Sequence, residues 1–141
     1  LSQQSWKFSL GVPSHKTGEI GGKPASLDEI EHKILRKEFD EPRIHFAINC
    51  ASISCPKLLN QAYTANKLDA QLEQAARAFI NDAKHNTLGK NQGELSPLFS
   101  WFKEDFTRKG SLVEFINQFA DNKLSKEAKI SFKNYNWSLN E

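Results

Sequence analysis

The chain of 141 residues lacks methionine, has only two cysteines and contains no long apolar run. Because methionine is absent, Leu1 is not a translation start, and we expect a processed or trimmed product that could have lost a leader. The apolar runs are too short to span a bilayer, which argues against a transmembrane segment. The 19 basic and 17 acidic residues are interspersed and give a net charge of +2, so no basic stripe indicates nucleic-acid binding.

Aromatic residues are what the sequence has in quantity. Ten phenylalanines and three tryptophans, in a chain with 38% hydrophobic residues, supply enough apolar area for a core. This length fits one domain, so we expect residues 1–141 to form a single domain. The apolar spacing predicts an α+β fold in which about four helices pack on a small, mainly antiparallel sheet.

Serine three residues before glutamate marks the start of two predicted helices. The segments Ser26-Leu27-Asp28-Glu29 and Ser111-Leu112-Val113-Glu114 are capping boxes, in which the serine and glutamate side chains satisfy free amides of the first turn. Pro42 should end the first of these helices near Lys37 or Glu38. Two further helices are expected, from about Thr64 and from Ser96-Pro97.

Alternating apolar residues predict strands elsewhere. Ile44, Phe46 and Ile48 alternate with small or polar residues, which is typical of a strand with one buried face. Turn-forming residues favour a hairpin later in the chain. The further predicted strands lie in this hairpin, over residues 86–94, and in residues 130–132.

Reactive side chains gather in residues 43–56, which hold both cysteines and one of the four histidines. A helix that begins at Pro56 would place Cys55 at its N-cap, where free amides and the positive helix end lower the pKa of a thiol. One hypothesis therefore makes Cys55 the nucleophile of a thiol-dependent hydrolase or transferase, with Cys50 as the alternative nucleophile. The substrate would be an amide, an ester or a thioester.

Three other side chains could assist such a nucleophile. We assign His45 as the general base and either His32 or Asn49 as the group that orients it. Asn49 could instead donate a hydrogen bond to an oxyanion. No cofactor is expected, and the ligand would be a small molecule or a peptide.

Two other interpretations of the same residues stay open. A disulfide between Cys50 and Cys55 would close a small loop and stiffen a non-catalytic, extracytoplasmic binding or structural module. A metal site built from His32, His45 and the two cysteines is the third interpretation, because zinc accepts mixed ligands of these types. The residues alone leave open whether the chain is an enzyme.

Other ionisable residues are expected to be solvated. His85 lies in a predicted loop and should be exposed. Glu104 and Asp105 form an acidic pair at a helix end, where carboxylates stay in solvent or face the helix dipole. Catalysis by paired carboxylates needs two elements to converge, so we assign this pair no catalytic role.

Several motifs resemble the domain-of-unknown-function 547 family, and together they cover nearly the whole chain. The resemblance implies that the positions of His32, His45, Cys50 and Cys55 belong to a shared site. The matching segments are residues 21–36, residues 42–50 followed by Ser54-Cys55-Pro56, Ala62-Tyr63-Thr64, the predicted helix from Leu68 to Phe79, Leu95-Ser96 with Trp101 and Asp105-Phe106, and the ending Tyr135-Asn136-Trp137-Ser138-Leu139-Asn140.

The resemblance also implies a location and a neighbouring segment. Bacterial members often follow secretion signals, so we expect a periplasmic or extracellular protein. Family domains usually begin with a helix carrying a Phe-Trp-Ile-Asn-like motif, which would lie upstream of Leu1. We expect the apolar surface under that helix to be exposed or met by a partner chain. The closing motif of the family often has aspartate where Asn136 stands here.

Overall fold

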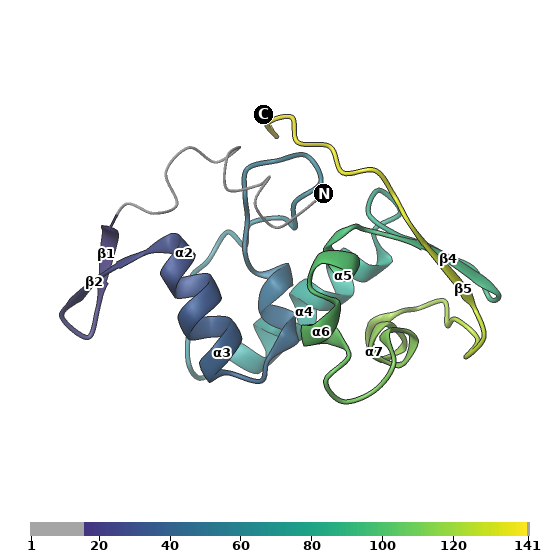
Figure 1. Cartoon of the computed structure of the whole chain (residues 1–141), viewed down its shortest axis with the longest axis horizontal. Coiled ribbons are helices and arrows are strands. Elements are labelled where there is room, and N and C mark those ends of the chain that lie inside the picture. Colours follow the sequence, from purple (N-terminus) through teal and green to yellow (C-terminus); the bar gives the residue numbers. More distant parts are fainter. Residues whose placement is uncertain (1–15, 141) are drawn as a thin grey trace. The chain divides into compact units, whose positions relative to one another are not determined.

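Helices and short strands alternate along the chain in the computed structural model, which describes residues 16–140 (Figure 1). The mixture confirms the predicted α+β class. The chain divides into two units, Leu1–Pro42 and Arg43–Glu141, and each unit is described by itself. That residues 1–141 form a single domain stays a prediction. No helix among residues 16–140 is long and apolar enough to span a membrane.

The first unit contains a tight hairpin. Strands β1 (Lys16–Ile20) and β2 (Lys23–Ser26) pair antiparallel. Gly21 and Gly22 join them with φ values of 57° and 75°. A two-residue turn with positive φ at both positions has the twist of the flanking strands, and glycine adopts it without steric cost.

A continuous helical run follows the hairpin. Ser26 Oγ accepts a hydrogen bond from the Glu29 amide at 3.2 Å, and the Glu29 carboxylate accepts one from the Ser26 amide at 3.0 Å. The predicted capping box is therefore confirmed. The run also ends at Glu38, as predicted from Pro42. It consists of α2 (Leu27–Glu29), a π-helical segment η1 (Ile30–Leu35) and α3 (Arg36–Glu38).

The segment at the start of the second unit is helical, although a strand was predicted there. The strand predicted over residues 44–49 is wrong, because Pro42–Phe46 form a 3-10 helix, η2. Ile44, His45 and Phe46 are buried in succession, whereas a strand with one solvent face would expose the middle residue. Packing on both sides of this segment outweighs the alternation in its sequence.

The long helix α4 (Leu68–Asn81) begins later than the predicted start at Thr64. The buried Gln71 explains the difference. Its Oε1 accepts a hydrogen bond from the Thr64 amide and its Nε2 donates to the Ala62 carbonyl, both at 3.0 Å. These bonds hold the preceding segment in a turn. The apolar spacing of this helix predicts a core face of Leu68, Leu72, Ala75, Ala76, Phe79 and Ile80. Four of these residues are buried, whereas Ala75 is partly buried and Leu68 is 44% exposed.

Three short helices complete the helical part of the second unit. The run predicted from Ser96-Pro97 is split at Phe102, which has φ −111° and ψ 28°. The capping box at Ser111 is confirmed, with the Glu114 amide 3.2 Å from Ser111 Oγ. The helices are α5 (Leu98–Trp101), α6 (Lys103–Phe106) and α7 (Leu112–Phe119).

A three-stranded sheet has the order β3-β4-β5. Strands β3 (Thr87–Leu88) and β4 (Gln92–Leu95) form the predicted hairpin, and β5 (Lys129–Phe132) confirms the predicted last strand. β4 and β5 are parallel, and α5, α6 and α7 lie between them in sequence as the crossover that a parallel pair requires (Figure 1).

The core of the second unit is a cluster of aromatic rings around Phe46. Its ring centroid lies 5.2 Å from Phe79, 5.8 Å from Phe99 and 5.7 Å from Phe106. Aromatic pairs at such distances are stabilised by edge-to-face or offset stacking in addition to burial. Phe46 follows directly on His45, so this cluster fixes the position of the histidine in the candidate site.

Candidate functional site

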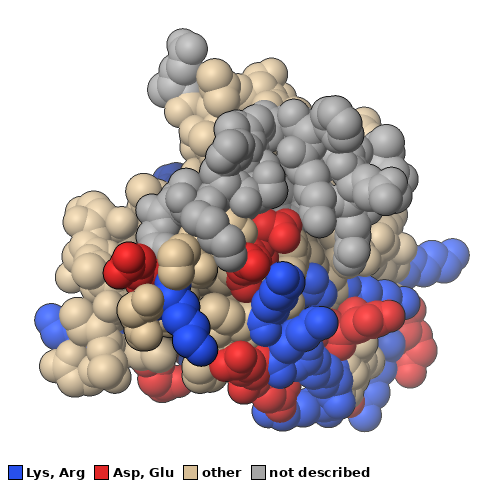
Figure 2. Space-filling model, turned by 60° about the vertical axis from the view of Figure 1, so that its left-hand side comes forward, with Lys and Arg blue, Asp and Glu red and all other residues tan. Residues whose placement is uncertain are grey.

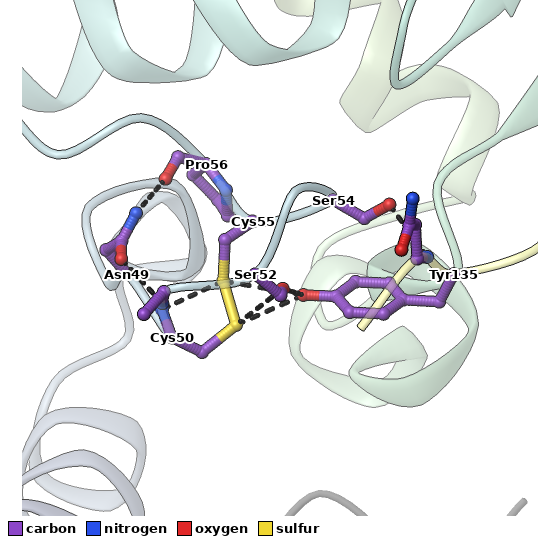
Figure 3. Close-up of a disulfide and its surroundings, with 9 residues drawn as sticks. Asn49, Cys50, Ser52, Ser54, Cys55, Pro56 and Tyr135 are labelled. Atoms are coloured by element: carbon purple, nitrogen blue, oxygen red, sulfur yellow. Dashed lines mark hydrogen bonds between the residues drawn. A yellow bond between two sulfur atoms is a disulfide. The ribbon is translucent and has the colours of Figure 1, made fainter. Parts of the chain in front are cut away.

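Cys50 and Cys55 form a disulfide, with their Cα atoms 6.0 Å apart (Figure 3). The bond closes a small loop, in which the Cys55 amide donates to the Ser52 carbonyl at 3.1 Å. The predicted disulfide is therefore present in the structure, whereas its role in a non-catalytic, extracytoplasmic module stays a prediction. In this state neither sulfur is a thiolate.

The helix expected after Cys55 is absent, so the predicted N-cap position for this residue is wrong. Pro56–Leu59 are irregular. The Asn49 side chain explains this local structure, because its Nδ2 donates to the Pro56 carbonyl at 2.8 Å while its Oδ1 accepts from the Ala51 amide at 2.7 Å. The amide of Asn49 thus braces both ends of the disulfide loop.

Hydrogen-bond donors surround both sulfurs. The Cys50 amide lies 2.8 Å from Cys55 Sγ. The Tyr135 hydroxyl lies 3.1 Å from Cys50 Sγ and 3.4 Å from Cys55 Sγ, and Ser52 Oγ lies 3.2 Å from Cys50 Sγ (Figure 3). Disulfide sulfurs carry no proton, so they only accept in these contacts. The two hydroxyls also bond each other at 2.8 Å.

Tyr135 keeps its proton in this position. Burial raises the pKa of its phenol above the usual 10.0, although the hydrogen bond with Ser52 works in the opposite direction. The Tyr135 ring is held by Trp101 and Trp137, with centroid distances of 4.8 Å and 4.3 Å. The hydroxyl is therefore a positioned neutral donor to the disulfide.

The segment after Tyr135 pairs with the disulfide loop. The Ile53 amide donates to the Ser138 carbonyl at 2.9 Å, and the Asn140 amide donates to the Ala51 carbonyl at 3.0 Å. In Figure 1 this yellow segment leaves β5 and runs back over the second unit. Ala51 has a φ of 59°, a left-handed conformation that costs a residue with a Cβ about 1 kcal/mol. The pairing with the C-terminal segment holds it there.

His45 is buried away from solvent and bonded to a carboxylate. Its Nε2 lies 2.9 Å from Asp105 Oδ2, and its ring stacks on Phe102 with a centroid distance of 4.1 Å. Asp105 also accepts from Arg108 at 2.7 Å. The expectation that Asp105 is solvated is wrong, because α6 turns this residue inward while its neighbour Glu104 stays exposed.

His32 lies in the helical run of the first unit. Arg36 Nη1 is 3.1 Å from its Nδ1, and Asp28 Oδ1 is 3.8 Å from its Nε2. These neighbours come from the same helical run at i−4 and i+4. The role assigned to His32 as an orienting group stays a prediction, as do the catalytic roles of His45, Asn49 and the two cysteines.

A cavity of about 350 Å³ lies beside the disulfide loop, between the irregular segment after Cys55 and α4. Its walls are mostly apolar, with a few polar side chains. The lining residues are Phe46, Pro56, Lys57, Leu58, Leu59, Asn60, Tyr63, Gln74, Ala75, Ala78, Phe79, Asp82 and His85.

His85 is part of this cavity wall, so the expectation that it is exposed is wrong. Its ring stacks on Phe79 at a centroid distance of 4.5 Å, and it is 8% exposed. Burial lowers the pKa of His85 below the usual 6.5, although Asp82 at 3.9 Å favours the charged form. Burial also raises the pKa of Tyr63 in the same cavity. Both groups are therefore neutral hydrogen-bonding groups near neutral pH.

A metal centre and a charged binding surface each require particular groupings of side chains in the described part of the chain. Residues 16–140 contain no group of three or more histidine, cysteine, aspartate or glutamate side chains placed to hold a metal ion. On the face drawn in Figure 2, lysine and arginine are interspersed with aspartate and glutamate.

A protein-family model matches the chain. The model described as "Protein of unknown function, DUF547" matches residues 2–80, which is more than half of the chain. The chain belongs to the DUF547 family. The resemblance predicted from the sequence motifs is thus confirmed. No curated protein and no solved structure matches the chain.

The DUF547 match covers some of the candidate site and leaves out the rest. His32, His45, Cys50 and Cys55 lie within residues 2–80, whereas Asp105 and Tyr135 lie outside them. Sequence reasoning missed the contacts of both. Tyr135 had one signal, since it opens the closing motif of the DUF547 resemblance. Asp105 had a similar signal, since Asp105-Phe106 is another segment of the resemblance, but its place beside a second acidic residue favoured a solvated carboxylate.

Asn136 occupies the position where DUF547 members often carry aspartate. Its Oδ1 accepts from the Ser138 amide at 3.0 Å, and its backbone amide donates to Ser54 Oγ at 3.0 Å. An asparagine oxygen supplies the acceptor that this turn needs. No carboxylate is required for this local structure.

Proposed function

We propose that this DUF547 domain is a non-catalytic binding module in which the Cys50–Cys55 disulfide holds one wall of a small-molecule site. One observation carries the proposal: one wall of the cavity is the segment 56–60, which starts directly after Cys55. Asn49 ties the Pro56 carbonyl back to the loop at 2.8 Å. The disulfide and this bond together reduce the freedom of the wall before any ligand binds, which lowers the entropic cost of binding.

The lining indicates the class of ligand. A volume of about 350 Å³ is at the lower end of the range for small-molecule sites. Phe46, Phe79 and Ala75 offer apolar contacts, while the imidazole of His85 and the phenol of Tyr63 offer neutral hydrogen bonds. The proposed ligand is therefore a small molecule with an aromatic or aliphatic body and one polar group.

A fluorescent probe tests the cavity directly. Anilinonaphthalene sulfonate has an aromatic body and one polar group, and its emission rises in apolar sites. We expect the probe to bind the native protein. Ala78→Trp should weaken binding at least about tenfold, because the indole ring would take the place of apolar contact between probe and wall that contributes over about 1.4 kcal/mol. Ala78 is exposed on α4, so the core should tolerate the change.

Ala70→Trp is the matched control. Ala70 is an exposed alanine of the same helix that does not line the cavity, so this variant should bind the probe as the parent does. Absence of binding by the native protein, or equal loss in both variants, would contradict the proposal.

We further propose a periplasmic or extracellular location. A disulfide persists in oxidising compartments and is reduced in most cytosols. Alkylation of the protein in intact cells, followed by mass measurement under denaturing conditions, should find both cysteines blocked from the reagent. Recovery of the protein only in the cytosolic fraction of the natural host would contradict this location.

A thiol-dependent hydrolase or transferase is the second candidate. It is favoured by the buried pair His45 and Asp105, because a carboxylate that holds an imidazole is the usual support of a general base. The cysteine bond would first have to be reduced. The reduced protein should then form an acyl adduct on Cys55 with a thioester, visible in the intact mass. Cys55→Ser should abolish the adduct and Cys50→Ser should keep it; any other pattern excludes this assignment.

A further inference from the structure

The two cysteines of the disulfide differ in exposure. Cys50 is half-buried, whereas Cys55 is 5% exposed. A thiolate that approaches from solvent therefore meets Cys50 first. The sulfur that is released in such an attack would be Cys55, which lies on the protein side of the bond.

The donors around the sulfurs suit thiolates better than they suit a disulfide. A hydrogen bond to an ionised acceptor is about twice as strong as one to a neutral acceptor. The Cys50 amide at 2.8 Å and the Tyr135 hydroxyl at 3.4 Å face Cys55 Sγ. Ser52 Oγ at 3.2 Å and the same Tyr135 hydroxyl at 3.1 Å face Cys50 Sγ. Each hydroxyl has one proton and donates to one sulfur at a time, so reduction strengthens the contact between a donor and whichever thiolate it faces.

We propose that this disulfide is a redox centre that exchanges with an external dithiol, a function beyond ligand binding. A thiolate of the dithiol attacks Cys50 Sγ and forms a new sulfur–sulfur bond to it. The Cys50–Cys55 bond breaks, and its electron pair leaves with Cys55 Sγ as a thiolate. The Cys50 amide and the Tyr135 hydroxyl stabilise this leaving group.

The second step completes the exchange. The second thiol of the dithiol loses its proton and attacks the first dithiol sulfur, which is bonded to Cys50 Sγ in the mixed disulfide. This attack releases Cys50 as a thiolate next to Ser52 and Tyr135. The external dithiol becomes a disulfide, and the two cysteines gain its two electrons. The two protons of the dithiol pass to the cysteine thiolates or to solvent.

Equilibration with a dithiothreitol redox buffer tests the stabilisation of the thiolates. We expect Tyr135→Phe to shift the equilibrium toward the protein disulfide by about tenfold or more, because it removes a hydrogen bond to a charged group. Trapping of free thiols with a maleimide, followed by intact-mass measurement, gives the reduced fraction. Ser100→Ala is the control: it removes an exposed hydroxyl on α5, outside the cavity lining, and should equilibrate as the parent does.

A second variant keeps the test valid if Tyr135→Phe does not fold. Ser52→Ala removes the other hydroxyl and should shift the same equilibrium in the same direction, with an unchanged circular dichroism spectrum. Equal equilibria for the parent, Tyr135→Phe and Ser52→Ala would overturn the proposal. So would a native disulfide that a large excess of dithiothreitol leaves intact.

Single-cysteine variants test the direction of attack. In Cys55→Ser the half-buried Cys50 is free, and in Cys50→Ser only the buried Cys55 is free. With glutathione disulfide, Cys55→Ser should form a mixed disulfide at least about tenfold faster, because thiol exchange depends on access. Equal rates, or a faster reaction of Cys50→Ser, would overturn the assignment of Cys50 as the attacked sulfur. This result does not depend on the cavity proposed above.

Discussion

Asp105 Oδ2 lies 2.9 Å from His45 Nε2, and both side chains are buried. A carboxylate only accepts hydrogen bonds, so Nε2 of this imidazole carries a proton. Sixty residues separate the two positions in the sequence. Their contact joins α6 to the 3-10 helix that leads into the disulfide loop.

Asp105→Ala should destabilise the protein strongly. It leaves the imidazole of His45 and the guanidinium of Arg108 without their shared carboxylate, and removal of one partner from a buried pair costs about 3 to 5 kcal/mol. Urea unfolding measures the loss. Asp69→Ala is the control, because Asp69 pairs with Arg43 at 2.8 Å but its side chain is 89% exposed. That change should cost less than about 1 kcal/mol. Similar losses in the two variants would show that burial of the Asp105 carboxylate adds nothing to its contribution.

Asn86→Ala should also be costly. The buried Asn86 donates to the Phe79 carbonyl at 2.8 Å and accepts from the Ser96 amide at 3.0 Å. Alanine leaves both backbone groups unsatisfied, which should cost about 3 kcal/mol in urea unfolding. Asn91→Ala, at an exposed turn position, should change the stability by less than about 0.5 kcal/mol. A loss below about 1 kcal/mol for Asn86→Ala would show that water replaces its bonds.

Loss of the disulfide should have a moderate effect on stability. The bond closes a loop between positions five residues apart, and the chain-entropy relation gives about 2 kcal/mol for so short a loop. The double variant Cys50→Ser/Cys55→Ser should lose this amount relative to the oxidised parent. The reduced parent, measured with the cysteines alkylated, is a second reference. A loss above about 5 kcal/mol would mean that the loop is essential for folding of the second unit.

Glu31 should make stability depend on pH. Burial raises its pKa from the usual 4.5 to about 7, and Asp28 adds to the shift while Arg36 opposes it. Between these values the folded chain holds a proton that the unfolded chain has released. Stability therefore falls as the pH rises through this window, by up to about 3 kcal/mol.

Glu31→Gln is the variant that isolates this effect, because it keeps the shape and removes the charge. It should be more stable than the parent near pH 8 and equal to it near pH 4.5, since the parent carboxyl is neutral only at the lower pH. Urea unfolding of both proteins across this range gives the difference directly. A constant difference at all pH values would show that the carboxyl titrates normally.

Local signals in the sequence predicted much of the secondary structure. The capping boxes at Ser26 and Ser111 mark their helices correctly because both partners lie within one helical turn. The hairpin turn at Gly21 and Gly22 is equally local, although no hairpin was predicted for these residues. In each case the hydrogen bonds that fix the structure are made by neighbours in the chain.

Features that depend on contacts between distant residues were not predicted from the sequence. The alternation of Ile44, Phe46 and Ile48 is typical of a strand, yet the burial of His45 against Asp105 requires a helical turn there. The site has the same property, because Tyr135 lies 85 residues from Cys50. The sequence shows that Tyr135 and Cys50 are both present, but their contact depends on how the core packs.

The pairing of residues 135–140 with the disulfide loop sets an order of events in biosynthesis. Synthesis runs from the N-terminus, so both cysteines leave the ribosome well before Tyr135 does. During that interval the sulfurs have no phenol beside them and the loop has no pairing segment. An oxidant that acts early therefore reacts with two thiols that have neither Tyr135 nor the C-terminal segment beside them. The disulfide of the finished protein lies in a different chemical environment from the one in which it formed.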